Sequence, residues 1–316
     1  MRDGREMKLS RPPPSFRVVL SDRLDPYWNL AAEECLLDRA AQAAPVLFLW
    51  QSAPAVIIGK NQNPWRECNL PWMAKHGVLL ARRISGGGAV FHDAGNLNYA
   101  FFMPREMYQA EVIFDVVLQT LSDLGFSAER TNRTSLSVDG LKVSGNAFCF
   151  RRNAALHHGT LLVSSDLEAL RASLQSPPWP FETRATESIR ADVRNLSAWN
   201  PSLAVAHVRD AFVARCSEGS PMDAVDQQLD AAAVDTRVSA QTADAWLYGQ
   251  TPPFEVRMPL ADGAEIAMAV EKGVVTRVTC EDEGRERALR VAWEGRPFAP
   301  DKMIRNVQHR IAHVQR

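Results

Sequence analysis

RRISGGGAVFHD, residues 82–93, places three consecutive glycines between two arginines and the strand-like pair Val90 and Phe91. A glycine run costs backbone entropy and gives up side-chain packing, so it is expected where the main chain must approach something closely. Such a loop can offer several backbone N–H groups to an anion, and neighbouring arginines suit phosphate or carboxylate. The segment therefore predicts an anion site, with a glycine-rich hairpin beside a solvated arginine pair as the alternative. It matches neither the P-loop nor the GxGxxG pattern, whose mechanisms do not transfer.

Composition restricts the class of protein. The 316 residues are enough for one large domain or two with a substantial core. Lysines and arginines number 36 against 37 acidic residues, so overall charge predicts no nucleic-acid or membrane partner. Five scattered cysteines without a CxxC pair favour the reduced thiols of a cytoplasmic protein. Residues 1–14 mix charges and end in three prolines, which predicts a disordered tail rather than a secretion signal.

Periodicity along the chain predicts alternating strands and helices. Apolar runs and alternation predict strands over residues 16–20, 46–50, 55–58, 96–102, 136–140 and 158–163. Helical spacing predicts helices over residues 26–37, 71–77, 111–125, 166–174 and 204–214. Asp25 and Pro26 are suited to the cap and first turn of the first helix. Residues 246–253 are interpreted as a hinge, and the alternating segments 254–260, 265–270 and 274–279 predict a small second domain.

Four further features could carry chemistry. Lys142 follows a glycine turn and precedes Ser-Gly, so its ammonium could reach an anion; a solvated surface lysine is the alternative. His157 and His158 are neighbours in a strand, point to opposite faces and cannot easily share a metal, and no structural metal site is predicted. Cys149 is interpreted as a small buried hydrophobe rather than a nucleophile. The amide-rich segment 61–65 is either a turn or the edge of a ligand pocket.

Taken together, these stretches resemble the lipoate–protein ligase family. The resemblance runs in register from about residue 16 to 200, through segments 47–50, 59–68, 82–96, 142–147, 157–162 and 188–196. Segments 248–252 and 270–273 resemble the accessory domain of two-domain members. The resemblance implies an α/β (α+β) fold of the biotin/lipoate ligase type, related to the class II synthetase core. It also implies a catalytic domain over residues 15–250 and a small α+β accessory domain over residues 251–316.

The resemblance implies a two-step reaction. Lipoate and ATP, with Mg²⁺, give lipoyl-AMP and pyrophosphate. The lipoyl group then passes to a lysine on the lipoyl domain of a 2-oxoacid dehydrogenase E2 subunit or on the glycine-cleavage H protein. Preplaced cations and backbone donors would reduce the repulsion between a carboxylate and the α-phosphate. The adenylate is already activated, so no covalent enzyme intermediate is needed.

The family pattern also implies roles for individual residues. Lys142 would be the catalytic residue and would reach both the lipoyl carbonyl and the phosphate. The residues assigned to ATP and the adenylate are Arg83, Gly87, Gly88, Ala89, Val90, Phe91 and Lys142. The residues assigned to lipoate are Ser85, His92, Asn96, Lys142, Gly145, Ala147, His158 and Thr160. No metal site made by protein groups alone is implied.

The chain departs from the family pattern at one place. Many ATP-using members have Arg-Asn-Asp before the strand that ends in the lysine, whereas this chain has Arg133-Thr134-Ser135. The alternative activity is therefore that of a lipoyltransferase, which starts from preformed lipoyl-AMP or a lipoyl carrier. Residues 127–130 lack the cysteine of octanoyltransferases, which argues against a thioester mechanism. A catalytically silent protein that binds lipoyl-AMP or a lipoyl domain is a further alternative.

Overall fold

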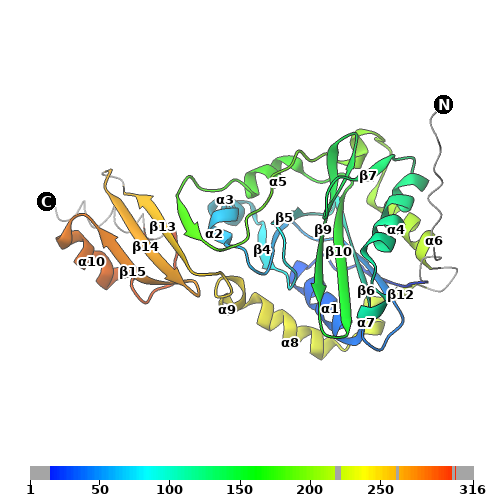
Figure 1. The fold of residues 1–316 in the computed structure, drawn as a ribbon, viewed down its shortest axis with the longest axis horizontal. Coiled ribbons are helices and arrows are strands. Elements are labelled where there is room, and N and C mark those ends of the chain that lie inside the picture. Colours follow the sequence, from blue (N-terminus) through cyan, green and yellow to red (C-terminus); the bar gives the residue numbers. More distant parts are fainter. Residues whose placement is uncertain (1–14, 218–221, 261–262, 301–302, 304–316) are drawn as a thin grey trace.

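The computed structural model describes residues 15–217, 222–260, 263–300 and 303, so the tail predicted over residues 1–14 lies outside the described residues. The chain forms a larger body around a mixed eight-stranded sheet and a smaller lobe at one end (Figure 1). Helices α8 (Ala231–Thr242) and α9 (Asp244–Leu247) run from the body towards the lobe. Among the described residues, no helix combines the length and apolar character needed to cross a membrane.

The main sheet has the strand order β12-β1-β2-β6-β10-β9-β8-β7. Its strands, in that order, are Asp223–Ala224, Arg17–Ser21, Val46–Trp50, Asn96–Pro104, Ala154–Leu162, Leu141–Phe150, Ser135–Val138 and Ala128–Arg130. β1 runs parallel to β2 and β12, and the remaining pairs are antiparallel. β6 is buried from Asn96 to Met103, because apolar clusters cover both faces of the sheet.

Helices cover the two faces of this sheet. α4 and α6 pack on one face, and α1 and α8 contribute to the apolar cluster on the other. Besides α8 and α9, the α-helices in chain order are α1 Pro26–Arg39, α2 Pro64–Glu67, α3 Leu70–His76, α4 Ala110–Asp123, α5 Leu167–Ser173, α6 Val205–Cys216, α7 Val225–Gln228 and α10 Glu283–Trp293. Short 3₁₀ turns are η1 Arg105–Met107 and η2 Leu196–Ala198. α1 begins as predicted, because the Asp25 carboxylate accepts the Tyr27 N–H at 2.9 Å and proline occupies the first turn.

A second, three-stranded sheet carries the glycine-rich loop. Its central strand β3 (Ala55–Ile58) pairs in parallel with β4 (Leu79–Arg82) and antiparallel with β5 (Val90–His92). The loop between β4 and β5 therefore has both ends fixed by hydrogen bonds to one strand. This arrangement restricts where the glycines can lie.

The smaller lobe contains the strands predicted beyond the hinge. β13 (Phe254–Pro259), β14 (Glu265–Glu271) and β15 (Val274–Cys280) form an antiparallel sheet on which α10 packs. A fourth strand, β11 (Phe181–Thr183), pairs with β13 although it precedes residue 250 in sequence. Trp65 from the larger body is also part of the apolar core of the lobe.

Candidate active site

The glycines of the loop are needed because other segments of the chain approach it. A Cβ on Gly59 would lie 2.2 Å from the Gly87 carbonyl oxygen, so only glycine lets the backbones of the 59–62 turn and the loop touch. Gly87 has φ +90°, a conformation that side-chain-bearing residues rarely adopt. A Cβ on Gly88 would meet the Ser188 hydroxyl at 3.1 Å. The glycine-rich loop therefore packs closely against the 59–62 turn and against Ser188.

The two arginines before the glycines have different partners. Arg82 is 1% exposed, and its guanidinium donates to the carbonyls of Gly59, Lys60 and Gln62. On its other side the guanidinium donates to the Leu247 carbonyl and the Thr251 hydroxyl. Arg83 donates to the carbonyls of Ile57, Gly86 and Gly88. Burial lowers the pKa of both guanidinium groups to about 10, so both stay charged at neutral pH.

A buried chain of hydrogen bonds connects helix α1 to this loop. The Glu33 carboxylate lies 2.7 Å from His158 Nδ1, and His158 Nε2 lies 2.7 Å from the Ser85 hydroxyl. Ser85 in turn accepts a hydrogen bond of 2.9 Å from Arg83 Nε. Glu33 also accepts the Trp50 indole N–H at 3.0 Å. These contacts fix the side chains of His158, Ser85 and Arg83 relative to one another.

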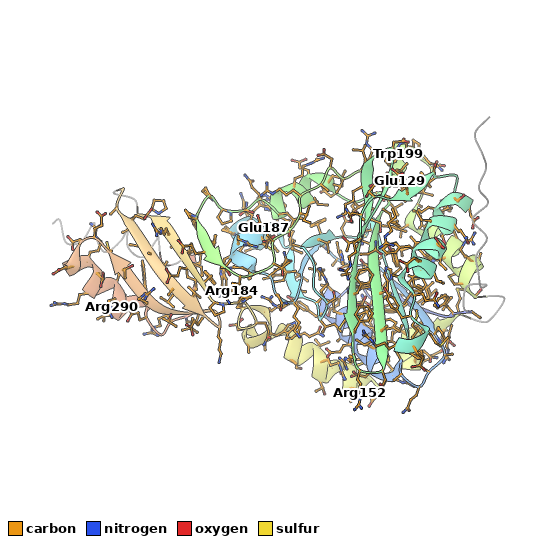
Figure 2. All side chains as sticks on the ribbon, in the orientation of Figure 1. Glu129, Arg152, Arg184, Glu187, Trp199 and Arg290 are labelled. Atoms are coloured by element: carbon orange, nitrogen blue, oxygen red, sulfur yellow. The ribbon has the colours of Figure 1, made fainter. Side chains whose placement is uncertain are left out.

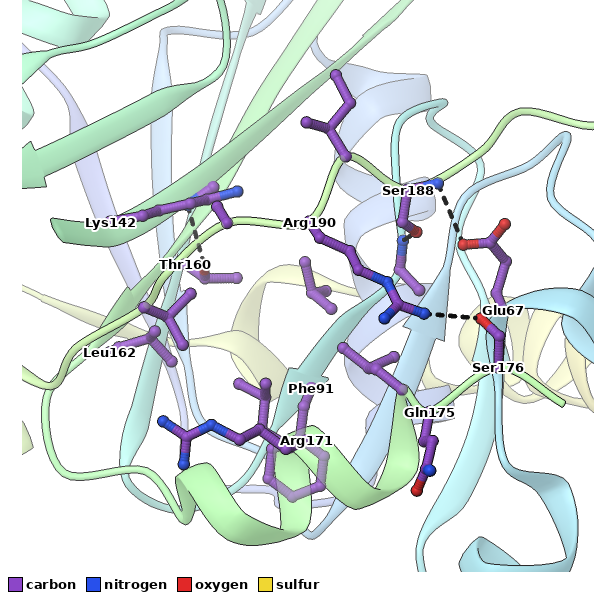
Figure 3. Close-up of a pocket in the computed structure, with 18 of the residues that line it drawn as sticks. Glu67, Phe91, Lys142, Thr160, Leu162, Arg171, Gln175, Ser176, Ser188 and Arg190 are labelled. Carbon is purple, nitrogen blue, oxygen red and sulfur yellow. Dashed lines mark hydrogen bonds between the residues drawn. The ribbon is translucent and has the colours of Figure 1, made fainter. Parts of the chain in front are cut away.

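A cavity of about 340 Å³ opens on the other side of the loop (Figure 3). Its walls come from β5, β9, β10, α2, α5 and residues 187–193. We call residues 186–195 the strap; it crosses the cavity between the Asn61 carbonyl, which accepts the Thr186 N–H, and β9 at Lys142. Glu187 of the strap lies between the larger body and the smaller lobe (Figure 2).

The side chains lining the cavity make it cationic. Arg66 is paired with Glu67 at 2.9 Å. Lys142, Arg171 and Arg190 also line the cavity, and none of them has a carboxylate partner within the part of the chain that the structure describes. Burial without a compensating charge lowers the pKa of the Lys142 ammonium. The cavity is therefore suited to an anionic occupant.

The structure brings six of the predicted site residues together in this cavity. They are Ala89, Val90, Phe91, Lys142, Gly145 and Thr160. Thr160 accepts the Gly145 N–H at 3.3 Å beneath the Lys142 side chain, so β9 and β10 present these groups as one surface. The roles assigned to them stay predictions.

The other predicted residues lie outside the cavity lining. They are Arg83, Ser85, Gly87, Gly88, His92, Asn96, Ala147 and His158. Arg83, predicted to face phosphate, lies beneath the loop and donates to its carbonyls instead. His92 is buried, its pKa is lowered to about 3, and neither ring nitrogen has a partner among the described residues. Asn96 donates to Asn98 within β6.

Several residues at the site were not among the sequence predictions. Arg171 on α5 and Arg66 on α2 line the cavity, as do Glu67 and the strap residue Arg190. Arg66, Glu67 and Arg190 lie in segments 59–68 and 188–196 of the family pattern, which assigns them no role. Arg171 lies outside that pattern, and its only sequence signal was its place in the helix predicted over residues 166–174. Glu33 was likewise seen only as a helix residue, because its partner His158 is 125 positions away. For the amide-rich turn, Gln62 borders the strap rather than the cavity.

Comparison with known proteins places this geometry in context. Residues 25–217 match the family model described as the lipoyl protein ligase A/B catalytic domain. The chain is similar to LipL1 of P. falciparum in complex with lipoate, with a TM-score of 0.64, 26% identity and coverage of 83% of each chain. It is similar to a lipoate–protein ligase A bound with ATP (TM-score 0.60, 25% identity), covering 73% of this chain and 98% of the other. A bipartite ligase of Thermoplasma acidophilum, described with its E2 lipoyl domain, gives a TM-score of 0.61 and 25% identity over 74% and 96% of the chains.

Proposed function

Since the chain belongs to the family of the lipoyl protein ligase A/B catalytic domain and has its mixed α/β fold, it is a ligase enzyme, and we propose that it activates lipoate with ATP and lipoylates proteins. The acceptors in this proposal are lysines on lipoyl domains of 2-oxoacid dehydrogenase E2 subunits and on the glycine-cleavage H protein. The observation that carries the proposal is the position of Lys142. Its ammonium lines a cationic cavity beside Ala89, Val90 and Phe91 and lacks a carboxylate partner among the described residues.

Lys142 suits both steps of this reaction. In the first step the lipoate carboxylate attacks the α-phosphorus of ATP and pyrophosphate leaves. In the second step the neutral acceptor amine attacks the acyl carbonyl, an amide bond forms, and AMP and a proton leave. Negative charge increases on the α-phosphate oxygens in the first step and on the acyl carbonyl oxygen in the second. An ammonium that is already placed beside these oxygens stabilises both transition states.

Mg²⁺ enters the proposal as the ion that accompanies ATP. Magnesium is usually held by substrate phosphates and one or two carboxylates. Glu67 is already engaged, because its oxygens accept from Arg66 and from the Ser188 N–H. Glu187 is the other carboxylate that lines the cavity, and it would bind Mg²⁺ together with the phosphates of ATP.

The alternative is a lipoyltransferase that uses preformed lipoyl-AMP or a lipoyl carrier. It is favoured by Arg133-Thr134-Ser135, where the Thr134 N–H donates to the Asn132 side-chain oxygen at 2.8 Å and neither Thr134 nor Ser135 lines the cavity. Intact-mass spectrometry of an apo lipoyl domain, incubated with the enzyme, lipoate, ATP and Mg²⁺, distinguishes the two. An ATP-dependent lipoyl mass gain supports the ligase. A gain only with supplied lipoyl-AMP supports the transferase that uses this donor. No gain with either contradicts the ligase and points to a lipoyl-carrier donor or to the catalytically silent protein.

A further inference from the structure

Ser188 lies where the strap crosses the glycine-rich loop. Its hydroxyl oxygen accepts the Ala89 N–H at 2.9 Å and the Gln62 side-chain N–H at 2.9 Å. Its own backbone N–H donates to Glu67 at 3.1 Å. The strap is therefore attached to the loop, to the 59–62 turn and to α2 through one residue. Figure 3 shows the hydrogen bond between Ser188 and Glu67.

The directions of these hydrogen bonds determine whether the Ser188 hydroxyl can accept or donate a further one. Gln62 is fully buried, and its side-chain oxygen accepts the Gly59 N–H at 2.8 Å, which fixes its NH₂ group towards Ser188. A serine oxygen has two lone pairs and one hydrogen. Both lone pairs of Ser188 are used by N–H donors, so its hydrogen can only be donated. Among the described residues no acceptor for that hydrogen is present, and Ser188 lines the cavity.

The charge of the cavity indicates what would accept this hydrogen. Lys142, Arg171 and Arg190 line the same space, so an anionic oxygen is the favoured acceptor. A hydrogen bond from a hydroxyl to an ionised oxygen is about twice as strong as one to a neutral oxygen. The donors that already bind Ser188 polarise its O–H further in the same direction. The Ser188 hydroxyl therefore accepts from the Ala89 N–H and offers its own hydrogen to an acceptor in the cavity.

We propose that Ser188 is a ligand-binding residue of the active site, whose hydroxyl donates to a phosphate oxygen of the bound nucleotide or acyl adenylate. This inference rests on the proposed function, because it takes a nucleotide as the occupant of the cavity. Ser188 combines two roles: its lone pairs hold the loop and Gln62, and its hydrogen contacts the ligand.

The test compares ligands that differ by one phosphate. Ser188→Ala removes the hydroxyl and keeps the backbone N–H that binds Glu67. Titrations of the wild type and variant with AMP, adenosine and lipoate, followed by NMR, should show AMP affinity reduced at least about tenfold in the variant. Adenosine and lipoate affinities should not change. Ser188→Cys, which keeps the size with a weaker donor, should lose less affinity for AMP.

The control is Ser173→Ala on α5, a buried serine outside the cavity lining whose hydroxyl has no partner among the described residues. This variant should bind all three ligands as the wild type does. Equal losses for AMP and adenosine in Ser188→Ala would mean that the serine only holds the strap, and would overturn the proposal. A loss for lipoate alone, or no loss at all, would overturn it too. A wild type that binds no nucleotide would contradict the proposed function itself, which the wild-type titration reveals separately.

Discussion

Replacing Lys142 with alanine should separate catalysis from stability. In the proposed reaction the ammonium is a single donor beside the reacting oxygens, and loss of one such donor lowers a rate about 10²- to 10³-fold. The fold should not weaken, because this cation has no carboxylate partner among the described residues and its burial lowers its pKa. A lysine whose folded pKa is below its unfolded value makes stability rise with pH between those two values. The wild type should show that rise below the unfolded pKa of 10.5, and the alanine variant should lack it.

The assay measures a single turnover of lipoyl-AMP to an apo lipoyl domain by intact mass, with thermal unfolding of each enzyme measured in parallel. Lys75→Ala on the exposed surface of α3 is the matched control and should transfer at the wild-type rate. Transfer by Lys142→Ala within about threefold of the wild type would refute the electrostatic role, which requires a far larger loss. A large fall in melting temperature would refute the claim that this lysine does not stabilise the fold.

Three further substitutions test the loop and the alternative chemistry. Gly87→Val adds a branched side chain at φ +90° and should weaken nucleotide binding; unchanged ATP affinity in calorimetry would mean that the loop is only a turn. Gly59→Ala places a Cβ 2.2 Å from a backbone oxygen and should destabilise the fold by about 1–3 kcal/mol in urea unfolding, which an unchanged midpoint would contradict. Cys149→Ser should keep its transfer activity, since burial raises the pKa of this thiol and the side chain does not line the cavity; complete loss would support a thioester route.

Local sequence signals predicted most of the secondary structure, and the expected fold class is confirmed. Where these signals were incomplete, contacts between segments far apart in the sequence determined the structure. The strand predicted over residues 96–102 is β6, and alternation of polar and apolar residues is typical of a strand with one solvated face. In the structure β6 is buried from Asn96 to Met103, and Asn96 donates a hydrogen bond to Asn98. β11 has three residues, too few to show a period, and acquires its partner β13 from 70 residues further along the chain.

The sequence predicted which segments form the site, but it did not predict which residues of these segments contact one another. Glycine composition located the loop, because few other features demand three glycines in a row. It could not reveal that the neighbours requiring those glycines include Gly59 and Ser188, which belong to other segments. Nor could it identify the separate partners of Arg82 and Arg83, because these include Leu247 and Ile57, which are 165 and 26 positions away in the sequence.

The partners of Arg82 also affect the order in which the protein can be completed during synthesis. Arg82 donates hydrogen bonds to Leu247 and Thr251, which follow it in the sequence by 165 and 169 positions. On the ribosome, Arg82 Nη1 can bond to the 59–62 turn early, but Nε and Nη2 lack these partners until more than half of the remaining chain has emerged. A nascent chain that ends before Leu247 can form the eight-stranded sheet but cannot desolvate this arginine with its final partners. Strand β4, and with it one end of the glycine-rich loop, is thus among the last parts of the larger body to become fixed.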